Sequence, residues 1–406
     1  MREIAEGCVK EWGMTGEDKL GVYVSVPFCR AKCSFCNFAS GVASAERIAG
    51  YVETLCAEIN ASADIAGKLR AELPRVVDTV YFGGGTPSLL TPVQMEAVFG
   101  ALRRNFDVQT DAEITMEAAP GQVAEATLDA AMRLGVNRVS LGVQSFVDRE
   151  SQAVGRTHTG TSCLAEIARL RAAGLQEVAA DLIAGLPYQT AESWQFSLNA
   201  AVGAELTHLS VYMLEVDEDS RLGLEVLAGG VRFHAHGVPS DEISAELYEQ
   251  ACGFLEPRFP QYEISNFAGA GHQSRHNRKY WERAAYVGFG LDAHSMLRTW
   301  DGAVRFANPE EQREYSPDGW GGKVVRVGVD EAFEERIFLG LRLRDGVDVA
   351  GLRAEFGNRV AGVEGAVEEM VKGGLMRAEE GRWSLTLRGR MVSNDVFGRL
   401  LEGVGV

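Results

Sequence analysis

The sequence predicts an α/β fold, in which a partial (β/α)6 barrel precedes a C-terminal α-rich, winged-helix-like domain. Between about residues 20 and 216, short β-rich runs alternate with stretches whose apolar residues recur at helical spacing. Parallel strands need a helical crossover, so six such units in series imply a parallel sheet. Their length of about 200 residues suits a partial barrel, because a complete one takes ~250. A doubly wound open sheet is the alternative.

Each predicted strand is a short run rich in β-branched and other apolar residues. The runs are Gly21–Pro27, Asp78–Gly83, Glu113–Ala118, Arg138–Gln144, Glu177–Ile183 and His208–Glu215. Between the first two runs, Ile48, Leu55 and Ile59 form an apolar stripe at helical spacing. The next helix is predicted to begin with a capping box formed by Thr91 and Gln94.

The alternation of strands and helices ends near residue 216. Asp241–Leu255 predicts a further helix, whereas residues 258–320 are aromatic, glycine-rich and irregular. The chain after residue 330 predicts three helices, a hairpin around Glu380–Arg382 and a final helix, an order that resembles a winged-helix domain. We therefore predict a barrel of residues 15–240, an irregular extension of residues 241–325 and a C-terminal domain of residues 326–406.

Composition and charge exclude several classes of protein. The chain has 406 residues, of which 46% are hydrophobic and 24% charged, as in ordinary globular proteins. No apolar run reaches the ~18 residues of a membrane span, and the charged N-terminus lacks an apolar signal core, so we expect a cytoplasmic protein not integral to the membrane. The net charge of −17 argues against nucleic-acid binding. Residues 331–406 carry 13 acidic and 11 basic side chains, so we expect a small capping domain without a nucleic-acid role rather than a DNA-binding winged helix.

Three of the seven cysteines, Cys29, Cys33 and Cys36, fall within eight residues. Such clustering indicates a metal or iron–sulfur site rather than a disulfide framework. A structural zinc site normally has four protein ligands, and no fourth Cys or His lies nearby, since Asn37 and Phe38 follow. Three thiolates can hold three irons of a cubane cluster and leave the fourth iron open. The alternative is three unconnected buried thiols.

Polar and glycine residues gather where the predicted strands end. In chain order they are the cysteine triplet, the loop Gly83–Pro87, Glu117, Gln144, Asp181 with Gly185–Pro187, and Glu215. Active sites of parallel α/β barrels lie at the carboxyl ends of the strands. We therefore predict that these residues form one site.

The spacing C-x3-C-x2-C of Cys29, Cys33 and Cys36 is the signature of the radical S-adenosylmethionine (SAM) superfamily. More narrowly, the chain resembles oxygen-independent coproporphyrinogen III oxidase and its relatives. The similar segments are residues 22–29, 82–88, 114–121, 141–146, 181–190 and 262–268. The resemblance covers nearly the whole chain, including the C-terminal domain.

This resemblance implies a 4Fe-4S cluster on the three cysteines, with SAM bound to the open iron through its amino and carboxylate groups. The residues that would line the SAM pocket are Tyr23, Phe35, Gly84, Gly85, Thr86, Glu117, Gln144, Arg156 and Asp181. Their chemistry agrees, because glycines let the backbone approach a ligand and a carboxylate can accept hydrogen bonds from hydroxyl or ammonium groups. Arg156 can pair with the SAM carboxylate, and Phe35 offers a face for adenine.

In two features the chain resembles the heme-chaperone branch of this family. The oxidase has a fourth cysteine two residues beyond the triplet, where this chain has Phe38. The branch also carries an H-N-x-x-Y-W motif, which stands here at His276–Trp281. Histidine is the commonest axial donor to heme iron, and Tyr280 and Trp281 offer flat apolar surface for a porphyrin. His276 and Tyr280 are therefore the predicted heme-binding residues.

Alternatives to these heme contacts remain open. His276 could instead order the irregular segment through hydrogen bonds, in which case His272, His294 or Tyr280 would be the iron ligand. Two positions also depart from the family pattern. Ala119 stands where relatives usually have Asn, and Asp292 stands where small residues are common.

The resemblance implies a heme chaperone that binds a 4Fe-4S cluster, SAM and heme. It would deliver heme to acceptor proteins and receive electrons for its cluster from a donor. The alternative is a radical SAM enzyme acting on a porphyrinogen, with coproporphyrinogen III oxidase activity or that of a related radical methylase. Phe38 in place of the fourth cysteine counts against the oxidase activity.

Overall fold

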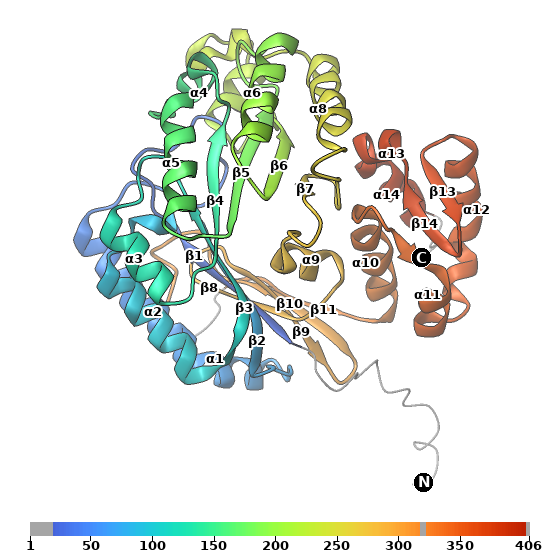
Figure 1. The fold of residues 1–406 in the computed structure, drawn as a ribbon. Helices are drawn as coiled ribbons and strands as arrows, with labels where there is room; N and C mark the ends of the chain where they lie inside the picture. The colour runs from blue at the N-terminus through green and yellow to red at the C-terminus, as the bar shows by residue number, and fades with distance from the viewer. Residues whose placement is uncertain (1–18, 317–321, 403–406) are drawn as a thin grey trace.

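The structure is a computed structural model that describes residues 19–316 and 322–402. Nearly all of the charged N-terminal stretch, and Cys8 within it, lie in residues 1–18, outside the described residues. The described chain forms a barrel-like domain, with the smaller C-terminal domain packed at its side (Figure 1).

The main sheet of the described chain has the strand order β11-β10-β9-β8-β1-β2-β3-β4-β5-β6-β7. Strands β1 to β6 pair in chain order and run parallel, so the predicted α/β fold class is confirmed. They are β1 (Leu20–Val26), β2 (Val76–Gly84), β3 (Asp107–Ala118), β4 (Arg138–Gln144), β5 (Glu177–Ala184) and β6 (His208–Met213). The barrel is not closed, because β6 pairs with the antiparallel β7 (Asn266–Ala268) rather than with β1.

Helices cover the outer face of the parallel strands (Figure 1). They are α1 (Ala45–Lys68), α2 (Pro92–Asn105), α3 (Glu125–Arg133), α4 (Asp148–Ala153), α5 (Gly160–Ala172) and α6 (Ala191–Gly203), with a short 3₁₀ turn η1 (Pro87–Leu89). Leu55 and Ile59 of the predicted stripe are fully buried. The capping box of Thr91 and Gln94 forms as predicted at the start of α2.

The segment expected to be irregular contains more regular structure than its sequence indicated. After α7 (Arg221–Leu227) and the 3₁₀ turn η2 (Arg232–Gly237) come α8 (Asp241–Leu255), which has the predicted bounds, and β7. Then follow α9 (Arg275–Trp281), β8 (Tyr286–Phe289), β9 (His294–Thr299), β10 (Gly302–Ala307) and β11 (Val324–Val327). Strand β8 pairs parallel with β1 and so extends the barrel sheet. Strands of three to six residues are too short for the alternation of apolar and polar residues to predict them.

The C-terminal domain has its own apolar core, which includes Phe333, Val363 and Val396. Its helices are α10 (Val329–Arg342), α11 (Val349–Phe356), α12 (Arg359–Lys372), α13 (Leu387–Met391) and α14 (Ser393–Glu402). Its sheet has the order β12 (Val347–Asp348), β14 (Arg382–Leu385) and β13 (Met376–Glu379). The predicted hairpin turns at Glu380 and Gly381, which both have positive φ, and the single final helix expected is divided into α13 and α14.

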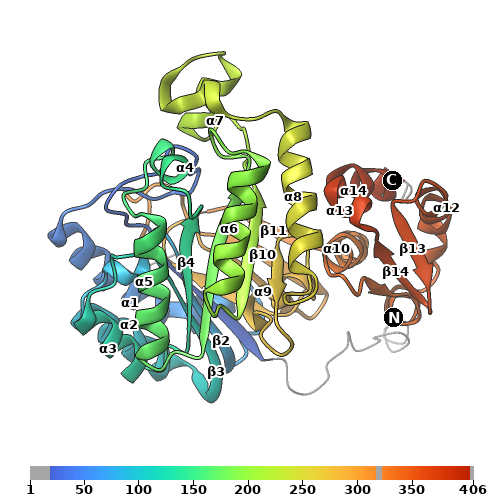
Figure 2. The same ribbon diagram turned by 45° about the horizontal axis from the view of Figure 1, so that its top comes forward.

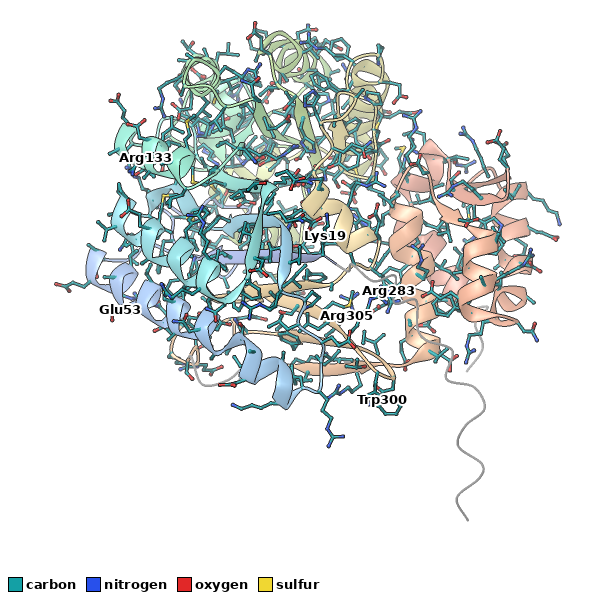
Figure 3. The ribbon with its side chains drawn as sticks, turned by 60° about the horizontal axis from the view of Figure 1, so that its bottom comes forward. Lys19, Glu53, Arg133, Arg283, Trp300 and Arg305 are labelled. Atoms are coloured by element: carbon teal, nitrogen blue, oxygen red, sulfur yellow. The ribbon has the colours of Figure 1, made fainter. Side chains whose placement is uncertain are left out.

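A buried carboxylate joins the two parts of the molecule. Glu335 of α10 binds Arg283, which lies between α9 and β8, and Arg305 of β10. Figure 3 labels both arginines, which lie where the barrel sheet meets the C-terminal domain. One carboxylate between two guanidinium groups fixes α10 against the sheet.

None of the helices in residues 19–316 and 322–402 combines the length and the apolar character needed to cross a lipid bilayer.

Candidate cluster and cofactor site

The loop after β1 carries Cys29, Cys33 and Cys36, and backbone hydrogen bonds hold it from both sides. The Cys29 amide donates to Gly41, and the Ser34 amide donates to Val154 at 3.1 Å. Cys33 is buried, whereas Cys29 and Cys36 are partly exposed. The loop therefore presents three thiols at the carboxyl end of β1.

Helix α7, which lies at the top of Figure 2, and the segment just before it contact the same loop. The amide of Leu222 donates to the carbonyl of Ser34 at 2.8 Å, and the side chain of Asn37 donates to Asp217 at 3.4 Å. Arg221 also donates to the carbonyl of Lys32. These contacts restrict the loop without using any of its three sulfur atoms.

The donor set of the loop fits a cubane cluster. Within the described residues, no three His, Cys, Asp or Glu side chains converge on the position of a single metal ion. A cubane does not require such convergence, because each thiolate binds a different iron. Burial raises the pKa of Cys33, and the guanidinium groups of Arg156 and Arg221 oppose that rise. These two cations would also offset the negative charge of a thiolate-bound cluster.

The glycine loop after β2 packs directly against the cysteine loop. Gly84 has φ +101°, and a Cβ on Gly85 would lie 2.6 Å from the carbonyl oxygen of Phe28. Thr86 donates a weak hydrogen bond from its hydroxyl to the sulfur of Cys29 at 3.7 Å. Glycine is therefore required here by close backbone contact as well as by backbone conformation.

The two loops border a cavity of about 1050 Å³, here called the larger cavity. It is lined by the three cysteines and by eight of the nine residues predicted for SAM, which come from five successive strand ends. These eight are Phe35, Gly84, Gly85, Thr86, Glu117, Gln144, Arg156 and Asp181. The structure thus brings together the polar residues whose sequence positions indicated a single site.

The two carboxylates of the larger cavity are buried among hydrogen-bond donors. Tyr81 donates to Glu117 at 2.8 Å, and Ser140 donates to Asp181 at 3.1 Å. Burial and the nearby charge of Asp181 raise the pKa of Glu117 to about 7. Burial also raises the pKa of Asp181, although the hydrogen bonds from Ser210 and Ser140 act to lower it. Both groups can accept hydrogen bonds from a ligand, and a cationic ligand would favour their charged forms.

Arg156 reaches the cavity over a glycine. A Cβ on Gly142 would lie 3.1 Å from a terminal nitrogen of Arg156 and 2.9 Å from the side-chain amide nitrogen of Gln144. The Nε of Arg156 is buried and has no hydrogen-bond partner among the described residues. Gln144 itself has φ +68°. Because Arg156 lines the cavity, its guanidinium group fits the binding of a carboxylate there.

Tyr23 lies elsewhere, on a second cavity of about 330 Å³, here called the smaller cavity. Its walls include the aromatic rings of Tyr23, Tyr280 and Tyr286, together with Ser25, Phe38, Ala39, Gly84, Leu291, Asp292 and His294. Phe38 and Gly84 line both cavities, so the two adjoin.

Helix α9, which carries the H-N-x-x-Y-W motif, is fixed inside the barrel by a buried acid. Glu113 of β3 accepts hydrogen bonds from the amides of Arg275 and His276, both at 3.0 Å, at the start of α9. Lys279 forms an ion pair with Asp78 at 2.8 Å. The orientation of the motif is therefore set by charged groups on β2 and β3.

His276 is 1% exposed, and both of its ring nitrogens are hydrogen-bonded. Nδ1 lies 2.9 Å from the hydroxyl of Thr79, and Nε2 lies 2.8 Å from the hydroxyl of Tyr280. Burial lowers the pKa of His276 to about 3, so the ring is neutral at pH 7. Iron ligation by His276 would require one of these hydrogen bonds to break.

The other candidate iron ligands differ in access. The side chain of His294 is 70% exposed and lines the smaller cavity, with Nε2 at 3.7 Å from Asp292. His272 lies away from both cavities, and its Nδ1 is 2.7 Å from the carboxylate of Glu177. Tyr280 lines the smaller cavity but shares its hydroxyl with His276. His294 thus has the most accessible imidazole of the three histidines.

The positions that depart from the family pattern also lie at the cavities. Phe38 is 61% exposed on the rim shared by the two cavities. Ala119 lines the larger cavity, and Asp292 lines the smaller one. Asp292 has φ +56°, a left-handed conformation that Asp tolerates better than most residues.

Two groups of residues at the site were not predicted from the sequence. Tyr81 and Ser140 bond to the two carboxylates, and the alternation of strand side chains could have indicated them, because Tyr81 shares a face of its strand with Gly83 and Ser140 shares one with Gln144. Arg342, Arg390, Ser393 and Asn394 bring the C-terminal domain into the wall of the larger cavity. No local pattern indicates these four, because their approach depends on how the two parts of the molecule pack.

Comparisons with known proteins relate both parts of the chain to described families. A family model described as "Radical SAM superfamily" matches residues 23–201, and one described as "HemN C-terminal domain" matches residues 329–392. The protein named "Heme chaperone HemW" of Bacillus subtilis is 32% identical over 387 residues, which cover 93% of this chain and 98% of that protein. The mitochondrial "Radical S-adenosyl methionine domain-containing protein 1" of Bos taurus is 33% identical, covering 84% and 75%.

A solved structure is similar over most of the chain. The coproporphyrinogen III oxidase HemN of Escherichia coli superposes with a TM-score of 0.78 over 95% of this chain and 90% of that one. At 23% identity, the likeness shows a shared fold.

Proposed function

The chain belongs to the radical SAM superfamily, in the family of the heme chaperone HemW, and from this premise we propose that it binds heme and delivers it to acceptor proteins. One observation carries the proposal. An accessible imidazole, His294, lies on a cavity walled by three tyrosine rings, and this cavity adjoins the one that contains the cysteine loop. A heme needs a flat apolar contact and an axial donor, and this arrangement offers both.

We assign the 4Fe-4S cluster to Cys29, Cys33 and Cys36. When bound, the cluster would supply an electron and an open iron for SAM. The protein side chains would orient that ligand. Arg156, whose Nε is buried without a partner among the described residues, would bind the SAM carboxylate. Phe35, from within the cysteine loop, would cover the adenine.

The remaining cavity residues have complementary roles in this proposal. Glu117 and Asp181 would accept hydrogen bonds from the SAM ammonium and ribose hydroxyl groups, and Tyr81 and Ser140 hold the two carboxylates in place. The backbone of Gly84, Gly85 and Thr86 would approach the ligand closely, and the amide of Gln144 would add a hydrogen bond. Tyr23 borders the smaller cavity, so it would contact SAM only across the shared rim at Gly84.

For the heme iron we favour His294 over His276. The ring of His294 is exposed to the smaller cavity, whereas both nitrogens of His276 are already hydrogen-bonded. Tyr280 would contact the porphyrin with its ring, and its edge-to-face contact with Tyr286, at 4.6 Å between centroids, keeps that ring in place. His276 would act as a positioning residue for Tyr280.

Hemin titration of the reconstituted protein tests this proposal. We expect His294→Ala to shift the Soret band and to weaken hemin binding about tenfold or more, because an axial bond is lost. His276→Gln should keep the Soret band at its wild-type position, because in this proposal His276 positions Tyr280 and does not bind the iron. The matched control is His234→Ala, which removes an exposed histidine that bonds to Tyr188 away from both cavities. A wild-type protein that fails to bind hemin would refute the proposal.

The heme acceptor and the electron donor for the cluster follow from the resemblance to the heme-chaperone branch. Hemin-loaded protein should transfer its heme to an acceptor apoprotein faster than bound hemin dissociates spontaneously from the protein into solution. A transfer rate equal to that of simple dissociation would contradict a delivery role.

A second function, a radical SAM enzyme acting on a porphyrinogen, is favoured by one observation. The larger cavity keeps the three cysteines and both ligand-accepting carboxylates, Glu117 and Asp181, together. Phe38 stands against the oxidase form of this function. Anaerobic incubation with dithionite, SAM and coproporphyrinogen III decides between them, since formation of protoporphyrinogen would establish the enzyme.

A further inference from the structure

Part of the wall of the larger cavity comes from the C-terminal domain. Arg342 closes α10, Arg390 lies in α13, and Ser393 and Asn394 begin α14. These side chains border the same cavity as the cysteine loop, although they lie more than 300 residues further along the chain. The barrel contributes Tyr248, Ile264 and Ser265 beside them, all outside the residues proposed for SAM.

The guanidinium group of Arg390 makes no hydrogen bond and no ion pair to any residue that the structure describes. Its Nε is fully buried without a partner. Burial lowers the pKa of Arg390, while the nearby Tyr248 and Cys252 oppose that shift. The nearby carboxylate of Glu256 is already paired with Arg344 at 2.6 Å.

Arg342 is held in place but only partly neutralised. Its guanidinium stacks on the ring of Trp281, the last residue of the H-N-x-x-Y-W motif, at 4.2 Å. The closest carboxylate, Glu263, is 4.0 Å away, too far for a direct hydrogen bond. The Nε of Arg342 is also buried, with no hydrogen-bond partner in the described part of the chain. Trp281 and Glu263 therefore orient the group, and its terminal nitrogens, rather than the enclosed Nε, are the donors that a ligand in the cavity would reach.

Two guanidinium groups that border one cavity without a close carboxylate partner make that part of its wall favourable for an anionic ligand. They are also unusual in a chain whose net charge is −17. Arginine binds carboxylates through two parallel hydrogen bonds, and the hydroxyl of Ser393 and the amide of Asn394 add neutral donors. The adjoining walls supply Tyr248 and Ile264, so the anion should be attached to an apolar body.

We infer that Arg342 and Arg390 bind the propionate carboxylates of a porphyrin that extends from the smaller cavity, past the shared rim at Phe38 and Gly84, into the larger cavity beside the C-terminal domain. The inference rests on the proposed function, because a dicarboxylate with a flat apolar body is what heme would present. SAM has a single carboxylate, and Arg156 on the cysteine side of the cavity is available to bind it. The volume of about 1050 Å³ reaches the upper end of the range for cavities that hold one small molecule, so it has room for part of a second ligand.

The test compares hemin with hemin dimethyl ester, whose propionates carry no charge. Both ligands are titrated in the same mixed solvent into the full-length protein with its cluster reconstituted. We expect wild-type protein to bind hemin about tenfold or more tightly than the ester. Arg342→Gln and Arg390→Gln should each reduce hemin affinity about tenfold, with little effect on the ester, and the double variant should lose the preference. Arg388→Gln is the matched control, because Arg388 lies on the same short helix but is exposed to solvent.

The outcomes separate this inference from the proposed function. If wild-type protein binds hemin and its ester equally well, or if the double variant keeps the preference, the carboxylate site is refuted while heme binding stands. If wild-type protein binds neither ligand, the proposed function fails and the inference fails with it. Cluster absorbance and SAM affinity are measured on every variant to establish that it is folded. The comparison of hemin with its ester on wild-type protein does not depend on any substitution.

Discussion

The hydroxyl of Tyr280 lies 2.8 Å from Nε2 of His276, and this contact connects the two cavities. Tyr280 faces the smaller cavity. On its other side, His276 stacks on Tyr81 at 5.3 Å, and Tyr81 donates to Glu117 in the larger cavity. A ligand that moves Tyr280 would therefore disturb, through direct contacts, a carboxylate proposed to bind SAM.

The buried neutral state of His276 predicts a pH-dependent stability. Its pKa is about 3 in the folded protein, against about 6.5 when the chain is unfolded. The unfolded state therefore binds an extra proton between these values, so this stabilising contribution is complete above pH 6.5 and is lost as the pH falls toward 3. Between pH 7 and pH 5 we expect a loss of about 2 kcal/mol from this residue.

Denaturant unfolding of wild-type protein and His276→Gln at both pH values checks this prediction. The variant cannot titrate at this position, so the stability difference between the two proteins should shrink by about 2 kcal/mol at pH 5. His208 is also buried with a lowered pKa, but it is present in both proteins and cancels. A stability difference that does not change with pH would show that His276 is accessible to protons in the folded state.

The assignment of the cluster predicts which cysteines are essential. Replacing Cys29, Cys33 or Cys36 by Ala should abolish the visible absorbance of the anaerobically reconstituted protein, because the remaining two thiolates cannot hold the cubane. Cys56→Ala and Cys163→Ala are the controls, since these residues lie in α1 and α5. Electron paramagnetic resonance with and without SAM then tests whether one iron is open to the ligand. Zinc in place of iron, or loss of the cluster in a control variant, would contradict the assignment.

Arg156 has a separate predicted effect on SAM. Arg156→Gln should weaken SAM binding about tenfold to a hundredfold, since a hydrogen bond to a charged group contributes about 1.5–3 kcal/mol. The cluster absorbance should be retained, because Arg156 is not a thiolate ligand. Arg149→Gln serves as the control, because Arg149 is exposed and stacks on Tyr188 at 4.0 Å. Unchanged SAM affinity in Arg156→Gln, measured by equilibrium dialysis, would remove Arg156 from the pocket.

The parallel strands and their ends could be predicted because both signals are local. The helices at α2 and α8 carry caps and apolar stripes within a few residues, and a glycine, cysteine or polar residue lies within three residues of the end of each strand from β1 to β6. The environment of His276 could not be predicted in the same way. Its neighbours Thr79 and Tyr81 lie almost 200 residues away, and the motif alone does not show that α9 is buried inside the barrel.

The position of Tyr23 illustrates a different limit. Alternation along β1 predicts that Tyr23 points into the barrel, but it does not show that the interior is divided into two cavities. The division depends on α9 and β8, whose short elements gave no clear pattern. Arg342 and Arg390 were missed for a related reason, since their role depends on the contact between two separately packed cores.

Gly85 offers a test of how tightly the glycine loop and the cysteine loop must pack. A methyl group at this position would lie 2.6 Å from the carbonyl oxygen and 2.7 Å from the amide nitrogen of Phe28, and both are backbone atoms that cannot rotate away. Gly85→Ala must therefore push apart the segments that position Thr86 and Cys29, which already share a contact at 3.7 Å. We expect a loss of stability of about 3 kcal/mol and a reduced yield of cluster on reconstitution.

Gly41→Ala is the matched control for this substitution. The carbonyl of Gly41 accepts a hydrogen bond from the amide of Cys29 in the same region, but a methyl group on Gly41 would have no described atom of another segment within 4 Å, and its backbone has no positive φ. Its stability should change by no more than about 0.5 kcal/mol, with a normal cluster. Thermal unfolding followed by circular dichroism, together with cluster absorbance, measures both effects. If the two variants behave alike, the close contact between Gly85 and Phe28 does not control the geometry of the cluster loop.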